Sequence, residues 1–174
     1  MGKAFQKLYD FCGALAGGLI ILICLLISAQ IILNAVGRLS PGTFPSTIPS
    51  YADFSGFMLA GATFLALAHT LRAGGHIRVN LVTDRLPERG RFFLEGGVLV
   101  LATALVGFAV WFMAGLVSES LHYGDVSPGI IPVALWIPQG IATFGLGLLL
   151  VAIVHTFVEL VLGGKPILST PDEV

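Results

Sequence analysis

Charged residues are scarce in this 174-residue sequence. Only 11% of the residues are Asp, Glu, Lys or Arg, whereas 56% are hydrophobic and the mean hydropathy is +0.94. Soluble domains carry roughly 25% charged residues, because polar groups must cover their surface. A chain of this composition cannot face water on all sides. The sequence therefore excludes an ordinary soluble protein and predicts an integral membrane protein with a single membrane domain, residues 1–174.

Cysteine is also rare, and neither sign of charge dominates. Cys12 and Cys24 fall in the same apolar stretch, where thiols that fill space are a better interpretation than a disulfide or a metal site. The formal net charge is −1, so nothing suggests nucleic acid as a partner. We therefore expect no disulfide, no metal or other cofactor and no nucleic-acid partner.

The motifs of common catalysts and pumps are missing. There is no glycine loop of the Walker type, no nucleophile elbow and no HExxH sequence. Coupled transporters usually place ionisable groups at mid-membrane, because ions and protons need partners there. No such group is predicted centrally in an apolar stretch, since Asp53 and Glu159 fall at the ends. We expect a subunit that is not an enzyme and has no catalytic residues.

Four long apolar stretches are present instead. A helix needs about 20 residues to cross a bilayer. The first stretch is too long for a cleavable signal peptide and lacks a cleavage site, so it is predicted to stay as an anchor. Two loops are rich in Pro, Gly and Ser: residues 37–50 separate the first stretch from the second, and residues 118–132 separate the third from the fourth. Residues 166–174 are predicted to form a disordered tail. The fold class is all-α, with spans at approximately 11–36, 54–71, 96–117 and 135–162.

A basic hinge, residues 72–91, joins the second and third spans and holds five of the nine Lys and Arg residues. Apolar residues alternate there with charged ones, which is typical of a short amphipathic segment lying in the membrane interface. Of all the basic residues, only Arg38 falls on the other side, so the positive-inside rule predicts cytoplasmic termini. The residues predicted to contact lipid or a partner at the inner leaflet are Arg72, His76, Arg78, Asp84, Arg85, Arg89 and Arg91.

The opposite, outer side carries a smaller set of charges. Ser50 followed by Asp53 has the form of a helix capping box, which favours a structural role for Asp53. Alternatively, Asp53 pairs with Arg38, or both residues belong to an outer docking surface. The residues predicted to contact lipid or a docking partner on this side are Arg38, Asp53, Glu119 and Asp125.

Two histidines leave a cofactor alternative open. His69 and His155 lie near the same membrane depth in the second and fourth spans, which is what a haem b held by two histidines requires. The interpretation we favour is two interfacial histidines bonded to water or backbone. His122 is expected to be solvated in the outer loop.

The hinge sequence resembles the small membrane subunit of tripartite ATP-independent periplasmic (TRAP) transporters, the DctQ-like family. The resemblance rests on residues 74–91, GGHIRVNLVTDRLPERGR, where members show a similar G-H-I-R-V-D-L run followed by D-R-L-P. Residues 34–38, NAVGR, and the acid Asp53 support it. Leu39 stands where members often have an aromatic residue, and Ala52-Asp53 supplies one acid where they tend to have two. Length, span number and orientation also agree.

The resemblance implies a small permease subunit that pairs as a heterodimer with a large membrane subunit. A periplasmic binding protein would capture a small organic acid, and the large subunit would move it inward by a sodium-driven elevator motion. The small subunit would act as a scaffold, or stator, held by phospholipids. The alternatives are a haem b electron-transfer subunit, the small subunit of a tricarboxylate-type tripartite transporter, and a lone structural or chaperone-like membrane protein.

Overall fold

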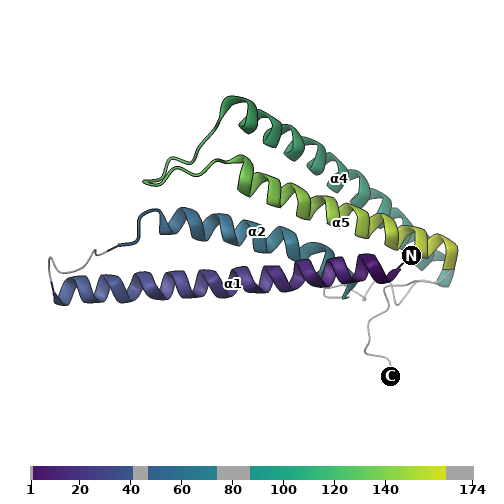
Figure 1. The fold of residues 1–174 in the computed structure, drawn as a ribbon. Helices are drawn as coiled ribbons and strands as arrows, with labels where there is room; N and C mark the ends of the chain where they lie inside the picture. The colour runs from purple at the N-terminus through teal and green to yellow at the C-terminus, as the bar shows by residue number, and fades with distance from the viewer. Residues whose placement is uncertain (1, 41–46, 74–86, 164–174) are drawn as a thin grey trace, which may run out of the picture.

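The computed structural model describes residues 2–40, 47–73 and 87–163, and these form four long helices (Figure 1). The helices are α1 (Gly2–Leu39), α2 (Tyr51–Arg72), α4 (Glu88–Tyr123) and α5 (Trp136–Gly163). All four are long and apolar enough to cross a membrane. In hydrocarbon, a single chain segment satisfies its backbone polar groups only as a helix, which explains why each apolar run takes this form. The predicted all-α membrane fold is confirmed.

Two of the helices are much longer than a bilayer core. At 1.5 Å per residue, α1 with 38 residues is about 57 Å long and α4 with 36 residues about 54 Å, against about 30 Å of hydrocarbon. The 22 residues of α2 give about 33 Å, close to one crossing. Each predicted span lies inside its helix, except that α5 starts one residue later than predicted. The extra length of α1 projects beyond the start of α2 (Figure 1).

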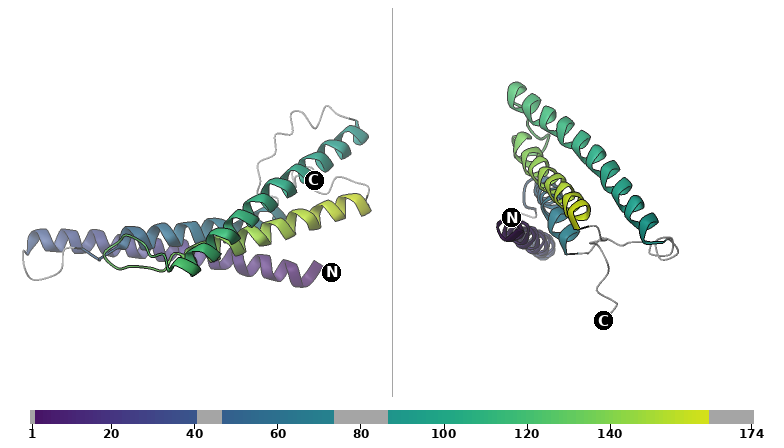
Figure 2. Two further views of the ribbon diagram at one scale, coloured as in Figure 1. Left: turned by 90° about the horizontal axis from the view of Figure 1, so that it is seen from above. Right: turned by 90° about the vertical axis from the view of Figure 1, so that its right-hand side faces the viewer.

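The helices form a layer in the order α1, α2, α5, α4 rather than a square bundle. α2 packs against α1 and α5, and α4 packs against α5 (Figures 1 and 2). We call the end that holds Arg72 and Gly163 the terminal end, and the end that holds Leu39 and Trp136 the loop end. Because α1 and α4 lie at the edges, most of their apolar side chains are exposed, whereas α2 and α5 supply most of the core.

Small residues allow the central helices to approach closely. A Cβ atom at Gly145 of α5 would overlap the backbone of Phe64 in α2, and one at Gly61 of α2 would touch Ile141. Around this contact, the α1–α2 side of the core is built mainly of alanine and leucine, and Leu99 of α4 joins Leu149 of α5 on the other side. Backbone proximity at small residues is how helices associate without a hydrophobic driving force between them.

At the loop end, residues 124–135 fold back on themselves. Gly124 ends α4 with a φ of 69°, which only glycine adopts easily. Val126 and Ala134 then form an isolated antiparallel bridge. The loop contacts the start of α2, where the Ile131 N–H donates to Ser50 Oγ at 2.9 Å.

The predicted capping box at the start of α2 is wrong, because the hydrogen bond from the helix backbone to the Ser50 side chain does not form. Ser50 does occupy the cap position, but its φ of 54° is left-handed and its side chain makes no hydrogen bond to the helix. The hydroxyl instead accepts the Ile131 N–H. Contact with the second loop has replaced the local cap.

Most of the basic hinge, including the predicted interfacial segment, falls in residues 74–86, outside the described residues. Its last residues, 88–91, form the first turn of α4. The predicted disordered tail also lies outside the described range.

Candidate functional site

An arginine–glutamate ion pair joins α2 to α5 at the terminal end. Arg72 Nη1 donates to Glu159 Oε2 at 2.7 Å, and Nη2 donates to Oε1 at 3.4 Å. The side chains are 19% and 34% exposed, so the pair is largely removed from water. A two-pronged arginine–carboxylate pair is both strong and directional. It fixes the relative position of the two central helices.

Further polar groups of α5 and α1 surround this pair. Thr156 Oγ1 lies 3.3 Å from Arg72 Nη1, and His155 Nε2 lies 3.2 Å from Glu159 Oε1, one helical turn away. Tyr9 of α1 is fully buried in the core cluster nearby. The carboxylate of Glu159 thus has side-chain partners on two helices, Arg72 on α2 and His155 on its own helix.

A second pair joins α1 to α2 at the same end. His69 Nδ1 lies 3.1 Å from Asp10 Oδ1, and Gln6 donates to the same oxygen at 3.1 Å. The imidazole packs on Gly13, where a Cβ atom would come within 2.8 Å of the ring. Only a glycine at this position leaves room for the histidine. We call the whole group the polar cluster: Tyr9, Asp10, His69, Arg72, His155, Thr156 and Glu159.

The polar cluster can hold three helices together, because its acidic side chains pair with basic side chains of the same chain. In a low-dielectric environment such pairs are strong when intact and costly when one partner is lost. His69 and His155 each contact a carboxylate, a partner that the sequence does not predict, and their bonding to water stays a prediction. Each thereby commits one ring nitrogen to a protein partner, His69 to α1 and His155 to its own helix.

The predicted inner-leaflet residues divide into two groups. Arg72 lies in the polar cluster, so its guanidinium is paired inside the chain, and a headgroup contact there stays a prediction. Arg89 and Arg91 lie in the first turn of α4, with Arg89 exposed and Arg91 partly buried. The remaining predicted positions lie outside the described residues: His76, Arg78, Asp84 and Arg85.

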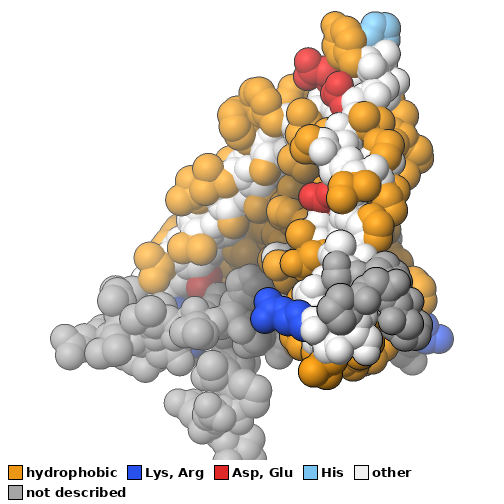
Figure 3. Space-filling view, turned by 90° about the vertical axis from the view of Figure 1, so that its left-hand side faces the viewer, with side chains coloured by type: hydrophobic (Ala, Val, Ile, Leu, Met, Phe, Trp, Pro, Cys, Tyr) orange, Lys and Arg blue, Asp and Glu red, His pale blue; other side chains and the backbone are white. Residues whose placement is uncertain are grey.

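The predicted outer residues are spread over the loop end. Arg38 near the end of α1, Glu119 in α4 and Asp125 after α4 are exposed. Asp53 is partly buried against Gly129 of the second loop, and no ion pair joins it to Arg38 in the described part of the chain. A shallow groove of about 300 Å³ lies between residues 47–53 and 128–130. Figure 3 shows this end, where hydrophobic side chains dominate with few acidic ones among them.

The sequence does not specify the partners of three polar residues. It places Glu159 only at a span end within reach of water. Gln30, 3% exposed, accepts the Ile48 N–H at 2.7 Å and donates to Thr47 at 3.1 Å, so it holds the chain that leads into α2. Glu95, 5% exposed, lies in α4 just before the predicted third span. For Glu159 and Gln30, a polar residue within an apolar run was the available signal.

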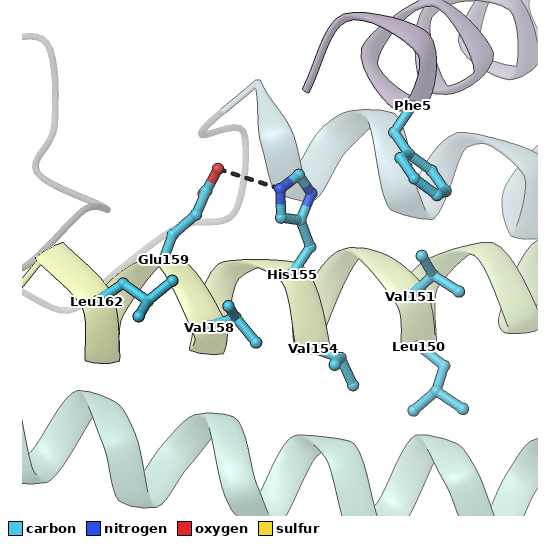
Figure 4. A pocket seen from close by; sticks show the side chains of 8 residues that line it. All are labelled: Phe5, Leu150, Val151, Val154, His155, Val158, Glu159 and Leu162. Atoms are coloured by element: carbon cyan, nitrogen blue, oxygen red, sulfur yellow. Dashed lines mark ion pairs between the residues drawn. The ribbon is translucent and has the colours of Figure 1, made fainter. Parts of the chain in front are cut away.

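Two apolar grooves run along one face of α5. The first, about 560 Å³, lies at the terminal end between Phe5 of α1 and residues 150–162 of α5, with His155 and Glu159 in its wall (Figure 4). The second, about 600 Å³, lies over α2 between the first half of α1 and residues 136–144 of α5. Both are open to the exterior rather than enclosed.

Residues 23–163 match the family described as Tripartite ATP-independent periplasmic transporters, DctQ component. The chain is also 23% identical over 133 residues to the ectoine TRAP transporter small permease protein TeaB of Halomonas elongata, an alignment that covers 74% of this chain and 67% of the relative. No solved structure matches the chain.

Proposed function

The chain belongs to the DctQ component family of tripartite ATP-independent periplasmic transporters, and from this premise we propose that it acts as the fixed membrane scaffold of such a transporter. The small permease subunit would stay in place in the bilayer while a large, elevator-type subunit moves cargo beside it. An elevator domain can only move relative to a part that does not.

The observation that carries this proposal is the pairing inside the polar cluster. Arg72 pairs with Glu159 between α2 and α5, and His69 pairs with Asp10 between α2 and α1. Charges used in this way stabilise a rigid layer, whereas a transport path needs polar groups that cargo can approach. The flat arrangement of the four helices also gives a wide lateral surface for a neighbour.

The cargo is proposed from family membership alone. We propose sodium-driven uptake of a small organic acid, captured by a periplasmic binding protein and carried by the large subunit. The relative TeaB is named for ectoine, which makes ectoine a second cargo to test. Substrate and sodium would bind to the large subunit rather than to this chain.

Orientation is proposed from the distribution of basic residues. The terminal end would face the cytoplasm across a bacterial inner membrane, with Arg89, Arg91 and the hinge near anionic headgroups at about 1 kcal/mol per basic residue. A single cysteine placed at Asp125, with Cys12 and Cys24 replaced by serine, should react with a membrane-impermeant thiol reagent in intact cells. A cysteine at Ala73 should react only after the cells are opened. The reverse pattern would contradict this orientation.

Co-purification tests the scaffold proposal. The tagged chain, co-expressed with the large membrane subunit of a TRAP transporter from the same organism, should retain that subunit in mild detergent at a fixed stoichiometry. An unrelated four-helix membrane protein with the same tag serves as the control. Purification of the chain without any large subunit would argue for a lone structural protein.

A further inference from the structure

One face of α5 has a seven-residue repeat that α1 borders on one side but leaves largely exposed in the described chain. Side chains seven residues apart lie almost above one another on a helix, and this spacing is the basis of helix pairing with slight supercoiling. Ile137, Phe144, Val151 and Val158 form one such series, and Gly140, Gly147, Val154 and Val161 form a second series beside it. We call this face the α5 seam, and its main positions are Ile137, Gly140, Phe144, Gly147, Val151 and Val158.

The exposure of the seam contrasts with the opposite side of the same helix. Phe144 is 53% exposed and Val158 44%, whereas Ala152 and Leu160, which point elsewhere on α5, are at most 1% exposed. α5 is the most deeply packed helix of the layer. An apolar seam on the central helix is therefore the natural place for a further helix to complete the packing.

The glycines of α5 divide in the same way. Gly145 is used within the chain, because α2 backbone occupies the space where its Cβ would lie. Gly140 and Gly147 have no atom of the described chain within 4 Å of that position. Glycines in a membrane helix allow another backbone to approach closely, and these two face outward on the seam.

The two grooves favour a helix over a lipid tail as the occupant. They lie along the seam, since one is lined by Val151 and Val158 and the other by Ile137 and Phe144. The Glu159 carboxylate lies in the wall of the first groove. It already pairs with Arg72 and His155, but its side chain is still 34% exposed, which leaves room for a further donor. A hydrocarbon tail offers nothing to this carboxylate, whereas a helix can donate a hydrogen bond to it.

We infer that the α5 seam receives one membrane-spanning helix of the large subunit, which donates a hydroxyl, amide or cationic hydrogen bond to Glu159. Residues 137–161 extend over about 36 Å of helix, enough to follow a partner helix through about 30 Å of hydrocarbon. This inference rests on the proposed function, because it takes the large subunit as the partner.

A pair of glycine variants tests the seam. Gly147→Leu fills space that is empty in this chain, so it should leave the chain folded while blocking close approach. Gly115→Leu is the matched control, because Gly115 of α4 is equally open. Gly147→Leu should reduce the large subunit recovered by co-purification about tenfold or more, and Gly115→Leu should leave it unchanged. Equal recovery with both variants, or a loss confined to Gly115→Leu, would overturn the inference.

Photocrosslinking identifies the contact without relying on affinity. Benzoylphenylalanine replaces Phe144 on the seam or, as the matched control, Phe108 on α4, which is 65% exposed. Crosslinks to the large subunit from position 144 and not from position 108 are expected. Three results would overturn the inference: crosslinks only from position 108, only to a second copy of this chain, or only to lipid. The proposed function would still stand in these cases if the large subunit co-purifies. Failure of the wild-type chain to retain any large subunit would overturn both.

Discussion

The two ends of the helix layer are held by different chemistry. At the terminal end, ionisable side chains from α1, α2 and α5 contact one another directly, as in the Arg72–Glu159 pair. At the loop end, the contacts use backbone groups and neutral side chains, such as Gln30 with Ile48 and Ser50 with Ile131. Removing one partner of a contact should therefore lower the free energy of unfolding most at the terminal end. The loop end is held by packing and by several weaker hydrogen bonds.

The largest effect is expected from breaking the ionic contact at the terminal end. Arg72→Leu leaves Glu159 without its principal partner in a largely buried site. The free energy of unfolding should fall by about 3 kcal/mol. Unfolding in mixed micelles with increasing SDS measures this change.

Two further variants separate the pair from a general loss of charge. Arg38→Leu, at an exposed position of α1, should change the free energy of unfolding by less than about 0.5 kcal/mol. The double variant Arg72→Leu with Glu159→Leu should recover most of the loss, because no charge is then left unpaired. A double variant as unstable as Arg72→Leu alone would show that packing, not the ion pair, holds the terminal end.

The next largest effect concerns the contact between the central helices. Gly145→Ala forces a methyl group against the backbone of Phe64, and overpacking of this kind costs about 2 kcal/mol. Gly147→Ala, two residues away and facing open space, should be neutral or slightly stabilising. The same unfolding measurement compares them. Equal effects would contradict the described α2–α5 packing.

A smaller effect is expected at the loop end. Gln30→Leu removes the acceptor of the Ile48 N–H and the donor to Thr47, at a cost of about 1–2 kcal/mol. Hydrogen exchange at the Ile48 amide should accelerate in the same variant. Asn34→Leu, an exposed position one turn further along α1, provides the control and should leave that amide protected.

The smallest effect sharpens the comparison within the terminal end itself. Asp10 is 53% exposed, so Asp10→Asn, which weakens its contact with His69, should cost less than about 1 kcal/mol. The unfolding measurement should therefore rank Asp10→Asn well below Arg72→Leu. A cost as large as that of Arg72→Leu would mean that both pairs act as one unit.

The fold class could be predicted because hydropathy alone specifies four helices, and backbone satisfaction in lipid leaves few other folds. The lengths of α1 and α4 could not be predicted from hydropathy. Both helices continue past the ends of their apolar stretches, through polar residues such as Asp10 and Glu119. The flat order of the helices depends on contacts between small residues, such as Gly145 with Phe64. Many glycines occur in this sequence, and spacing does not reveal which of them meet a neighbour.

The polar cluster could be predicted only in outline. The sequence indicates that Arg72 and Glu159 both lie at span ends, and the orientation of the helices places both at the same end. Their pairing depends on α2 and α5 being neighbours, which the sequence does not specify. Ser50 failed as a cap for the same reason, because its partner Ile131 is 81 residues away.

Uptake by proteoliposomes tests the central claim most directly, namely that this chain braces a transporter without carrying cargo itself. Vesicles are prepared with the chain alone, with the large subunit alone, and with both, each in the presence of binding protein, a labelled organic acid or ectoine, and an inward sodium gradient. We expect no uptake by the chain alone and full uptake only when both subunits are present. Sodium-dependent uptake by the chain alone would contradict the account.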